Sequence, residues 1–165
     1  MKSGQGRRRD PVCGMMVEAD GNAIEFRQMH FAFCSRQCRE RFLANPGLFV
    51  GQGGRKAPAQ EGRKVIKQRR LKLERPPAPE MAAEVIDAVQ AMMGIEDMAI
   101  EGDSVTLRYD LLQVTEAQIE VTLAQAGAVP GHECSERLRR AFVHCLEETE
   151  LDSLAASTSS HGHGH

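Results

Sequence analysis

The sequence predicts an α+β protein made of two small modules rather than one large domain. Aromatic residues make up only 4% of the 165 residues and tryptophan is absent, so neither half can rest on a large aromatic core. Residues 51–62 are rich in Gly and charge and lack apolar periodicity, which predicts a flexible linker. The cysteines divide in the same way, because residues 63–130 contain none.

The module before the linker, residues 10–50, has the pattern of a hairpin followed by a short helix. Ile24–Phe26 and Phe31–Phe33 are short alternating segments that can pair, with residues 27–30 as the turn. Ser35 is the expected N-cap of a helix that runs to about Ala44 and ends before a Pro-Gly pair.

The module after the linker, residues 63–130, predicts the order strand, helix, strand, strand, helix. A strand ends near Leu73, and Pro79 suits the first turn of a helix that stops at Gly94. Two apolar segments around residues 101–104 form a hairpin, and Thr115 with Gln118 makes a capping box for the second helix. An extra helix over 131–152 takes the place of a final strand, and 153–165 is expected to be a disordered tail.

Composition limits the classes of function. The middle of the chain is basic and the C-terminal half acidic, but the basic run has no aromatic stacking groups or groove-reading motif, so nucleic-acid binding is not expected. No apolar run is long enough to span a membrane or to follow the N-terminal arginines as a signal, which predicts a cytoplasmic protein. Five cysteines, an odd number, fit metal thiolates better than a disulfide framework.

Three of the cysteines have the spacing of a metal site. Cys34 and Cys38 are four residues apart, so at the start of a helix their sulfurs project from neighbouring turns of one face. Cys13 precedes Gly14, which permits a tight turn whose backbone amides point at a thiolate. The three residues predict a soft-metal site for Zn(II) or Cu(I).

The residues around these cysteines resemble a known family. The segments 10–17, DPVCGMMV, and 31–46, FAFCSRQCRERFLANP, are similar to the YHS domain, a TRASH-like family associated with heavy-metal sensing and trafficking. The resemblance covers about forty residues and implies a treble-clef-like module in which Cys13, Cys34 and Cys38 bind metal. His30-Phe31 stands where the family usually has a Gly-x-x-Tyr stretch.

Two residues are candidates for a fourth ligand. Asp10 occupies the position three before Cys13, where related treble-clef sites have a cysteine, and its carboxylate could complete a tetrahedral zinc site. His30 is the alternative. Each also has a plainer interpretation, Asp10 as a residue that caps the turn and His30 as a solvated hairpin residue. Three thiolates without a fourth ligand suit trigonal Cu(I).

The second module resembles another metal-associated family. Residues 94–100, 105–110 and 114–119 are similar to the heavy-metal-associated domain, the ferredoxin-like fold of copper chaperones and metal-ATPase N-termini. Its metal loop, a Cys-x-x-Cys between the first strand and helix, is absent, because residues 73–80 read LERPPAPE. The resemblance therefore implies a docking or dimerisation surface, with a homodimer, a metal-transporting ATPase or another metal-handling protein as candidate partners.

Two further sets of residues could bind metal. His132, Cys134, His144 and Cys145 would make a complete zinc set, but Cys134 and Cys145 lie too far apart on one continuous helix to share an ion. Only a break near Cys134 or a partner chain could join them. His161, His163 and His165 in the tail are either a native metal scavenger or an expression remnant.

The leading interpretation is a metal-handling protein that is not an enzyme. Neither a Ser/His/Asp grouping, nor a phosphate loop, nor paired carboxylates with a nearby base occur at useful spacing. The sequence instead favours trafficking, sensing or detoxification of a soft metal through the three cysteines. The alternative is a protein-interaction module in which zinc is purely structural.

Overall fold

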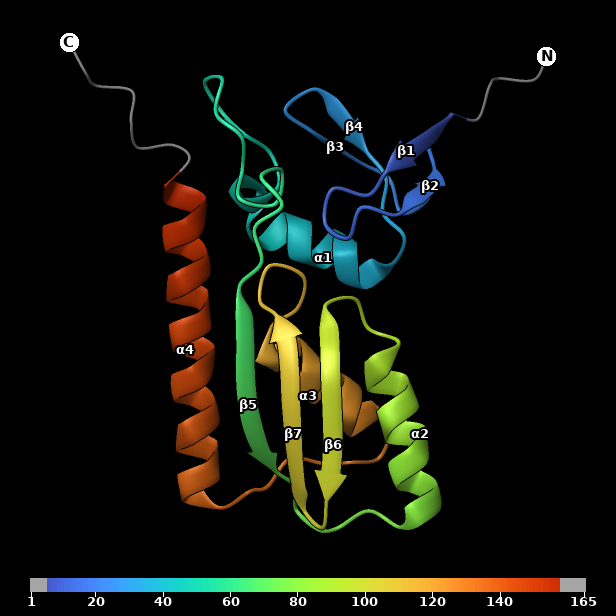
Figure 1. Ribbon diagram of the computed structural model, residues 1–165, viewed down its shortest axis with the longest axis vertical. Helices are drawn as coiled ribbons and strands as arrows, with labels where there is room; N and C mark the ends of the chain where they lie inside the picture. The colour runs from blue at the N-terminus through green and yellow to red at the C-terminus, as the bar shows by residue number, and fades with distance from the viewer. Residues whose placement is uncertain (1–5, 158–165) are drawn as a thin grey trace. The chain divides into compact units, whose positions relative to one another are not determined.

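The computed structural model describes residues 6–157 and shows a mixture of helices and small antiparallel sheets (Figure 1). The predicted α+β class is confirmed. The chain divides into two units, one with the residues up to Arg63 together with those from Leu151 onward, and one with Lys64–Glu150. Within the described range, no helix is both long enough and apolar enough to cross a membrane.

The first unit begins with two short hairpins. Strand β1 (Arg7–Arg9) pairs with β2 (Met16–Glu18), and β3 (Ile24–Phe26) pairs with β4 (Met29–Phe31). The second hairpin was predicted with its return strand at Phe31–Phe33, and this register is wrong. Arg27 and Gln28 both have positive φ, 50° and 64°, so they close a two-residue turn of the kind that hairpins favour and the return strand starts two residues earlier.

Helix α1 (Arg36–Ala44) follows the second hairpin, as predicted. Ser35 is its N-cap: the hydroxyl oxygen accepts a hydrogen bond from the backbone N–H of Cys38 at 3.4 Å. The helix ends at Asn45, and a short 3₁₀ turn, η1 (Pro46–Leu48), comes next. The buried ring of Phe42 in α1 contacts four other rings, those of Phe26, Phe31, Phe33 and Phe49, and this aromatic cluster is the core of the unit.

The predicted linker, residues 51–62, packs against the rest of the first unit. Ala57 is fully buried, and the backbone N–H of Ala59 donates to the carbonyl of Leu48 at 3.0 Å. The side chain of Gln60 accepts a hydrogen bond from the backbone N–H of Ala57. These contacts hold a stretch that has no apolar periodicity of its own.

The second unit follows the predicted order of elements. It contains β5 (Ile66–Lys72), α2 (Pro79–Gln90), β6 (Ile95–Glu101), β7 (Ser104–Asp110) and α3 (Glu116–Gln125). The strands form one antiparallel sheet in the order β5-β7-β6. The capping box of Thr115 and Gln118 at the start of α3 is confirmed. Gly94 has φ +89° and lies so close to Gln113 that a Cβ there would clash, which explains why α2 gives way to β6 at a glycine.

One face of this sheet carries the core of the second unit. Leu71, Val105 and Leu107 are fully buried on it, together with Tyr109. Val85 and Val89 of α2 and Ile119 and Leu123 of α3 are also fully buried, and Figure 1 shows α3 behind the sheet. At the outer edge of β5, Leu73 pairs with Pro130, so the chain makes a single bridge where a fourth strand could have formed.

Helix α4 (Cys134–Ala156) is shifted along the chain from the predicted 131–152, because it begins three residues later and ends four residues later. It was expected to end at residue 152, and it continues through residues that were assigned to the tail. Within the first unit, Asp152 of α4 accepts a hydrogen bond from the side-chain amide of Asn45 at 2.8 Å, which stabilises the added turns. The predicted metal-scavenging histidines, His161, His163 and His165, lie outside the described residues.

A buried polar network joins α3, α4 and β7 in the second unit. The hydroxyl of Tyr109 donates to the carboxylate of Glu147, which also accepts the backbone N–H of Glu116 at 2.8 Å. The buried carboxylate of Glu116 pairs with Arg139 at 3.0 Å. Burial is the main cause that raises the pKa of Tyr109, and the charge of Glu147 and the hydrogen bond to it add to the shift.

Candidate metal centre

Two chain segments bring the predicted ligands together. Asp10 follows β1 and Cys13 lies in the turn between β1 and β2, whereas Cys34 precedes α1 and Cys38 lies in its first turn. The turn is closed by two backbone hydrogen bonds, from Asp10 to the carbonyl of Met15 at 2.8 Å and from Gly14 to the carbonyl of Asp10 at 2.9 Å. Gly14 has φ +80°, a conformation that favours glycine.

The three sulfur atoms lie close to one another. The Sγ atom of Cys34 is 3.5 Å from that of Cys13 and 3.5 Å from that of Cys38. Three thiolates on one tetrahedral zinc ion, with Zn–S bonds of about 2.3 Å, have sulfurs about 3.8 Å apart. Together with a carboxylate oxygen of Asp10, the ligand atoms all lie within 4.8 Å of one another. This group of four residues could hold a metal ion.

Asp10 connects the two segments. It is almost completely buried, and one carboxylate oxygen accepts the backbone N–H groups of Val12 at 2.8 Å and Cys13 at 3.3 Å. The other oxygen accepts the N–H of Cys34 at 2.8 Å. The cap interpretation is therefore correct as far as it goes, but the oxygen that accepts only the N–H of Cys34 keeps a lone pair, so Asp10 could also act as a fourth ligand.

Burial makes the thiols of Cys13 and Cys38 weaker acids than an ordinary cysteine. Burial is the main cause that raises the pKa of Cys13 to about 12; a hydrogen bond with the backbone of Met15 opposes it, and the neighbours Cys34 and Asp10 add to it. The pKa of Cys38 is also raised, first by burial and then by Asp10 and the other two thiols. A metal ion would replace these protons and bind the thiolates, so metal binding would release protons.

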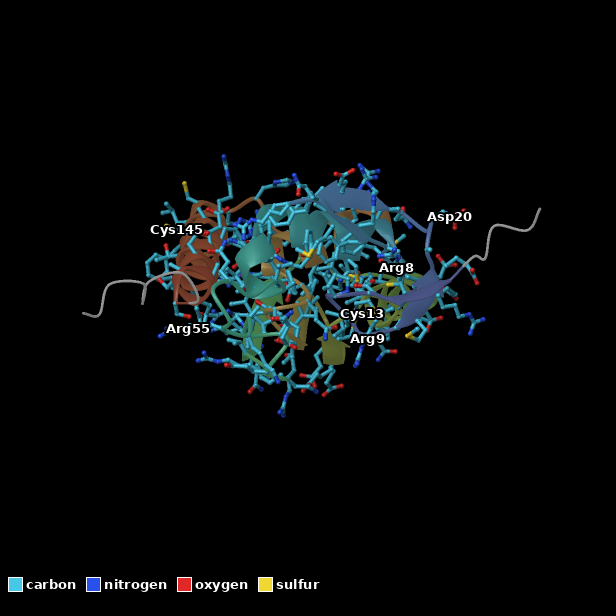
Figure 2. All side chains as sticks on the ribbon, turned by 90° about the horizontal axis from the view of Figure 1, so that it is seen from above. Arg8, Arg9, Cys13, Asp20, Arg55 and Cys145 are labelled. Carbon is cyan, nitrogen blue, oxygen red and sulfur yellow. The ribbon has the colours of Figure 1, made fainter. Side chains whose placement is uncertain are left out.

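The three cysteines differ in how far they are buried. Cys38 is fully buried, whereas Cys13 and Cys34 are half-buried. Figure 2 labels Cys13 and Arg9, which both come from the first hairpin. The guanidinium group of Arg9 lies against Gly14, where an added Cβ would come within 3.3 Å of it. Cys13 and Cys34 are therefore less enclosed than Cys38.

His30, the other candidate for a fourth ligand, is not part of this group. Its side chain is exposed on β4, and its carbonyl oxygen accepts a hydrogen bond from Arg8 at 2.9 Å. The histidine therefore contributes its backbone to the contact between the two hairpins. The structure favours Asp10 over His30 because only Asp10 lies with the three cysteines.

The possible second metal site is not brought together. Among residues 6–157, the Asp10 group is the only cluster of three or more His, Cys, Asp or Glu side chains that could hold an ion. Cys134 and Cys145 are exposed on the continuous helix α4, His132 lies 3.8 Å from Glu74, and His144 pairs with Glu120. The helix has no break near Cys134, which was the condition for one chain to join these residues.

Sequence reasoning missed two features of the site. β1 was not predicted, because Arg7–Arg9 carries only charged residues and has no apolar alternation. The hydrogen bond from Cys34 to Asp10 was also not foreseen, because it joins segments 24 residues apart in the chain. Comparison of the chain with protein-family models, with curated proteins and with solved structures gives no match.

Proposed function

We propose that this protein binds a soft metal ion, Zn(II) or Cu(I), through Cys13, Cys34 and Cys38, in metal trafficking, sensing or detoxification. The observation that carries the proposal is the convergence of three sulfur atoms, with 3.5 Å between neighbouring Sγ atoms, from two separate chain segments. Thiolates are the ligands that soft and borderline metals prefer.

The coordination number distinguishes the two metals. Zn(II) in protein sites is almost always tetrahedral, so it needs a fourth ligand, and the buried carboxylate of Asp10 is the residue placed to supply it. Cu(I) is satisfied by three thiolates. The same side chains can therefore accept either ion, and the role of Asp10 decides which is bound more tightly.

Partial exposure favours exchange of the metal over permanent storage. Cys13 and Cys34 are half-buried, so an incoming thiolate from another metal-handling protein, such as a metal-transporting ATPase, could reach the ion while Cys38 still holds it. Ligand exchange of this kind lets a tightly bound ion move between proteins without being released into water. The buried Cys38 would keep the ion in place until the transfer is complete.

We also propose that the two units are a treble-clef-like YHS module and a ferredoxin-like domain of the heavy-metal-associated type that lacks its metal loop. The strand, helix, strand, strand, helix order and the β5-β7-β6 sheet support the second assignment. The bridge of Leu73 to Pro130 lies at the edge of β5, where a fourth strand would complete such a sheet.

The alternative is a protein-interaction module with a structural zinc ion. Cys38 and Asp10 are buried, and a small unit with one aromatic cluster as its core gains stability from a bound metal. A structural ion should exchange over hours and be required for folding. A transported ion should exchange within minutes and leave a folded protein behind.

The test is competitive titration of the metal-free protein with Zn(II) and with Cu(I) against chromophoric chelators. We expect one tight equivalent, lost in each of the variants Cys13→Ser, Cys34→Ser and Cys38→Ser. Cys134→Ser and Cys145→Ser are matched controls, because both thiols are exposed and belong to the second unit. Undiminished tight binding in any of the three site variants would remove that residue from the site, and undiminished binding in all three would overturn the proposal.

A further inference from the structure

The part of helix α4 that belongs to the second unit has an exposed apolar face. Leu138 and Phe142 are 70% and 65% exposed, and Leu146 is 46% exposed. They follow one another at intervals of four residues, so they lie along one side of the helix. The opposite side, which carries Val143, Glu147 and Leu151, is buried.

The middle of this exposed face is free of charge over four turns. In the part of the chain that the structure describes, it is formed by Cys134, Leu138, Phe142, Cys145, Leu146 and Thr149. Figure 2 labels Cys145 on this helix. Scattered apolar residues on a surface are ordinary, but a continuous uncharged stripe on a helix is typical of a helix that pairs with another helix.

The spacing of the stripe is symmetric about Phe142. Leu138 precedes Phe142 by four residues and Leu146 follows it by four. When two copies of α4 lie antiparallel with the Phe142 rings together, Leu138 of each copy lies opposite Leu146 of the other. The face is therefore complementary to itself, which is the requirement of a twofold-symmetric interface.

The charges beside the stripe fit the same arrangement. Arg137 and Glu148 are exposed and lie on the same flank of the stripe, one toward each end of it. Among the described residues neither has an ion-pair partner, whereas Arg139, Arg140 and Glu150 are paired within the second unit. In the antiparallel pair, the flank that carries Arg137 and Glu148 lies on the same side of the contact in both copies, so Arg137 of each copy faces Glu148 of the other.

We propose that this face of α4 binds the same face of a second copy of the chain in antiparallel orientation. The stripe lies within residues 134–149, all of which belong to the second unit, so the interaction does not depend on the metal centre. One helix pair is small for a stable dimer, and the association should therefore vary with protein concentration.

Sedimentation velocity of the full-length protein over a wide range of concentrations is the first test. We expect a monomer–dimer equilibrium that Phe142→Glu weakens at least tenfold, because two carboxylates would meet at the centre of the contact. Val121→Glu is the matched control: Val121 is 56% exposed on α3, outside the stripe, and its replacement should leave the equilibrium unchanged. Circular dichroism checks that each variant is folded.

Two further measurements test the orientation and remain valid if Phe142→Glu does not fold. Arg137→Glu and Glu148→Arg should each weaken the dimer, and the two together should restore it. The orientation is tested by mixing two variants that both carry Cys134→Ser and Cys145→Ser, one with Leu138→Cys and one with Leu146→Cys. The new cysteine of the first variant should cross-link to that of the second. Two copies of the Leu138→Cys variant should not cross-link to each other. The proposal would be overturned if the protein were monomeric at every concentration or if Val121→Glu weakened the dimer as much as Phe142→Glu. It would also be overturned if the double charge exchange did not restore the dimer, or if position 138 cross-linked to position 138 of another copy.

Discussion

The carboxylate of Asp10 accepts a hydrogen bond from the backbone N–H of Cys34 at 2.8 Å, across 24 residues of chain. Its other oxygen accepts the N–H groups of Val12 and Cys13. One buried side chain therefore fixes the turn that carries Cys13 and the start of the helix that carries Cys38. The distances between the sulfurs depend on this contact as well as on the cysteines.

Asp10→Ala should destabilise the first unit even without metal. Three hydrogen bonds to a charged acceptor are lost and the backbone donors stay buried, so we expect a loss of about 3 kcal/mol in the free energy of unfolding. Affinity for both metals should fall, and that for Zn(II) more, because only Zn(II) needs the fourth oxygen. Asp20→Ala is the control, since Asp20 is exposed (Figure 2). Equal losses for the two metals would show that Asp10 positions the cysteines without binding the ion.

The cysteine group could be predicted from the sequence because its geometry is mostly local. A separation of four residues at a helix start places Cys34 and Cys38 together, and Gly14 identifies the turn at Cys13. The way in which the two segments are joined was not predictable, since the hydrogen bond from Cys34 to Asp10 requires a particular path of the intervening hairpins. The sequence could suggest Asp10 as a ligand or as a cap of its own turn, but it could not show the contact with Cys34.

The elements of the second unit were predictable for a similar reason, whereas its polar interior was not. The capping box at Thr115 and the proline at residue 79 act within a few residues, and the structure has both helices where these signals place them. Glu116 and Glu147, in contrast, have the sequence pattern of ordinary surface charges on amphipathic helices. Their burial depends on the packing of α3, α4 and β7, which no local pattern encodes.

Tyr109 provides a test of whether the two units depend on the metal separately. It is the only tyrosine, the chain has no tryptophan, and its buried side chain lies in the second unit. Removing the metal with a chelator should therefore leave the thermal transition seen by tyrosine fluorescence unchanged. The transition of the first unit, followed by circular dichroism, should move to lower temperature. If the metal had been present at 100 to 1,000 times its dissociation constant, its removal should lower the free energy of unfolding of this unit by about 3–4 kcal/mol.

Cys34→Ser is the control for this measurement, because its two curves should be the same with and without metal. A shift of the Tyr109 transition on chelation in the wild-type protein would contradict the prediction. It would show that the stability of the second unit also depends on the bound ion.

Glu116 should make the stability of the second unit depend on pH. Burial is the main cause that raises its pKa, Arg139 opposes the shift, and the neighbouring Glu120 and Glu147 add to it. The folded protein holds the proton of Glu116 more tightly than the unfolded chain does. Glu116 therefore contributes its full share of stability at pH values below the ordinary pKa of glutamate, and this contribution is lost as the pH rises above that pKa. Glu116→Gln should therefore gain stability relative to wild type as the pH rises above the ordinary glutamate pKa of about 4.3.

Urea unfolding at a series of pH values, followed by Tyr109 fluorescence, measures this difference. Glu84→Gln is the control, because Glu84 is exposed on α2 and the substitution should give a nearly constant difference from wild type. If Glu116→Gln lost stability relative to wild type as the pH rose, the ion pair with Arg139 would outweigh the burial of the carboxylate.

Phe42 should decide whether the first unit can fold without metal. Its ring is fully buried and lies 4.9–6.0 Å, between ring centroids, from the rings of Phe26, Phe31, Phe33 and Phe49. Phe42→Ala would leave a cavity at the centre of this cluster, and we expect a loss of about 3–5 kcal/mol in the free energy of unfolding. The core of a unit this small contributes a similar amount, so the metal-free variant should be unfolded there.

Leu43→Ala is the matched control for this prediction, because Leu43 is the next residue of α1 and is 50% exposed. Its replacement should change the free energy of unfolding by less than about 1 kcal/mol. Circular dichroism of both variants during titration with Zn(II) is the measurement. Phe42→Ala should gain helical signal as the metal binds, with a weaker apparent affinity, because part of the binding free energy is used to fold the unit. A metal-free Phe42→Ala protein as stable as Leu43→Ala would show that the aromatic cluster does not hold the cysteine segments in place.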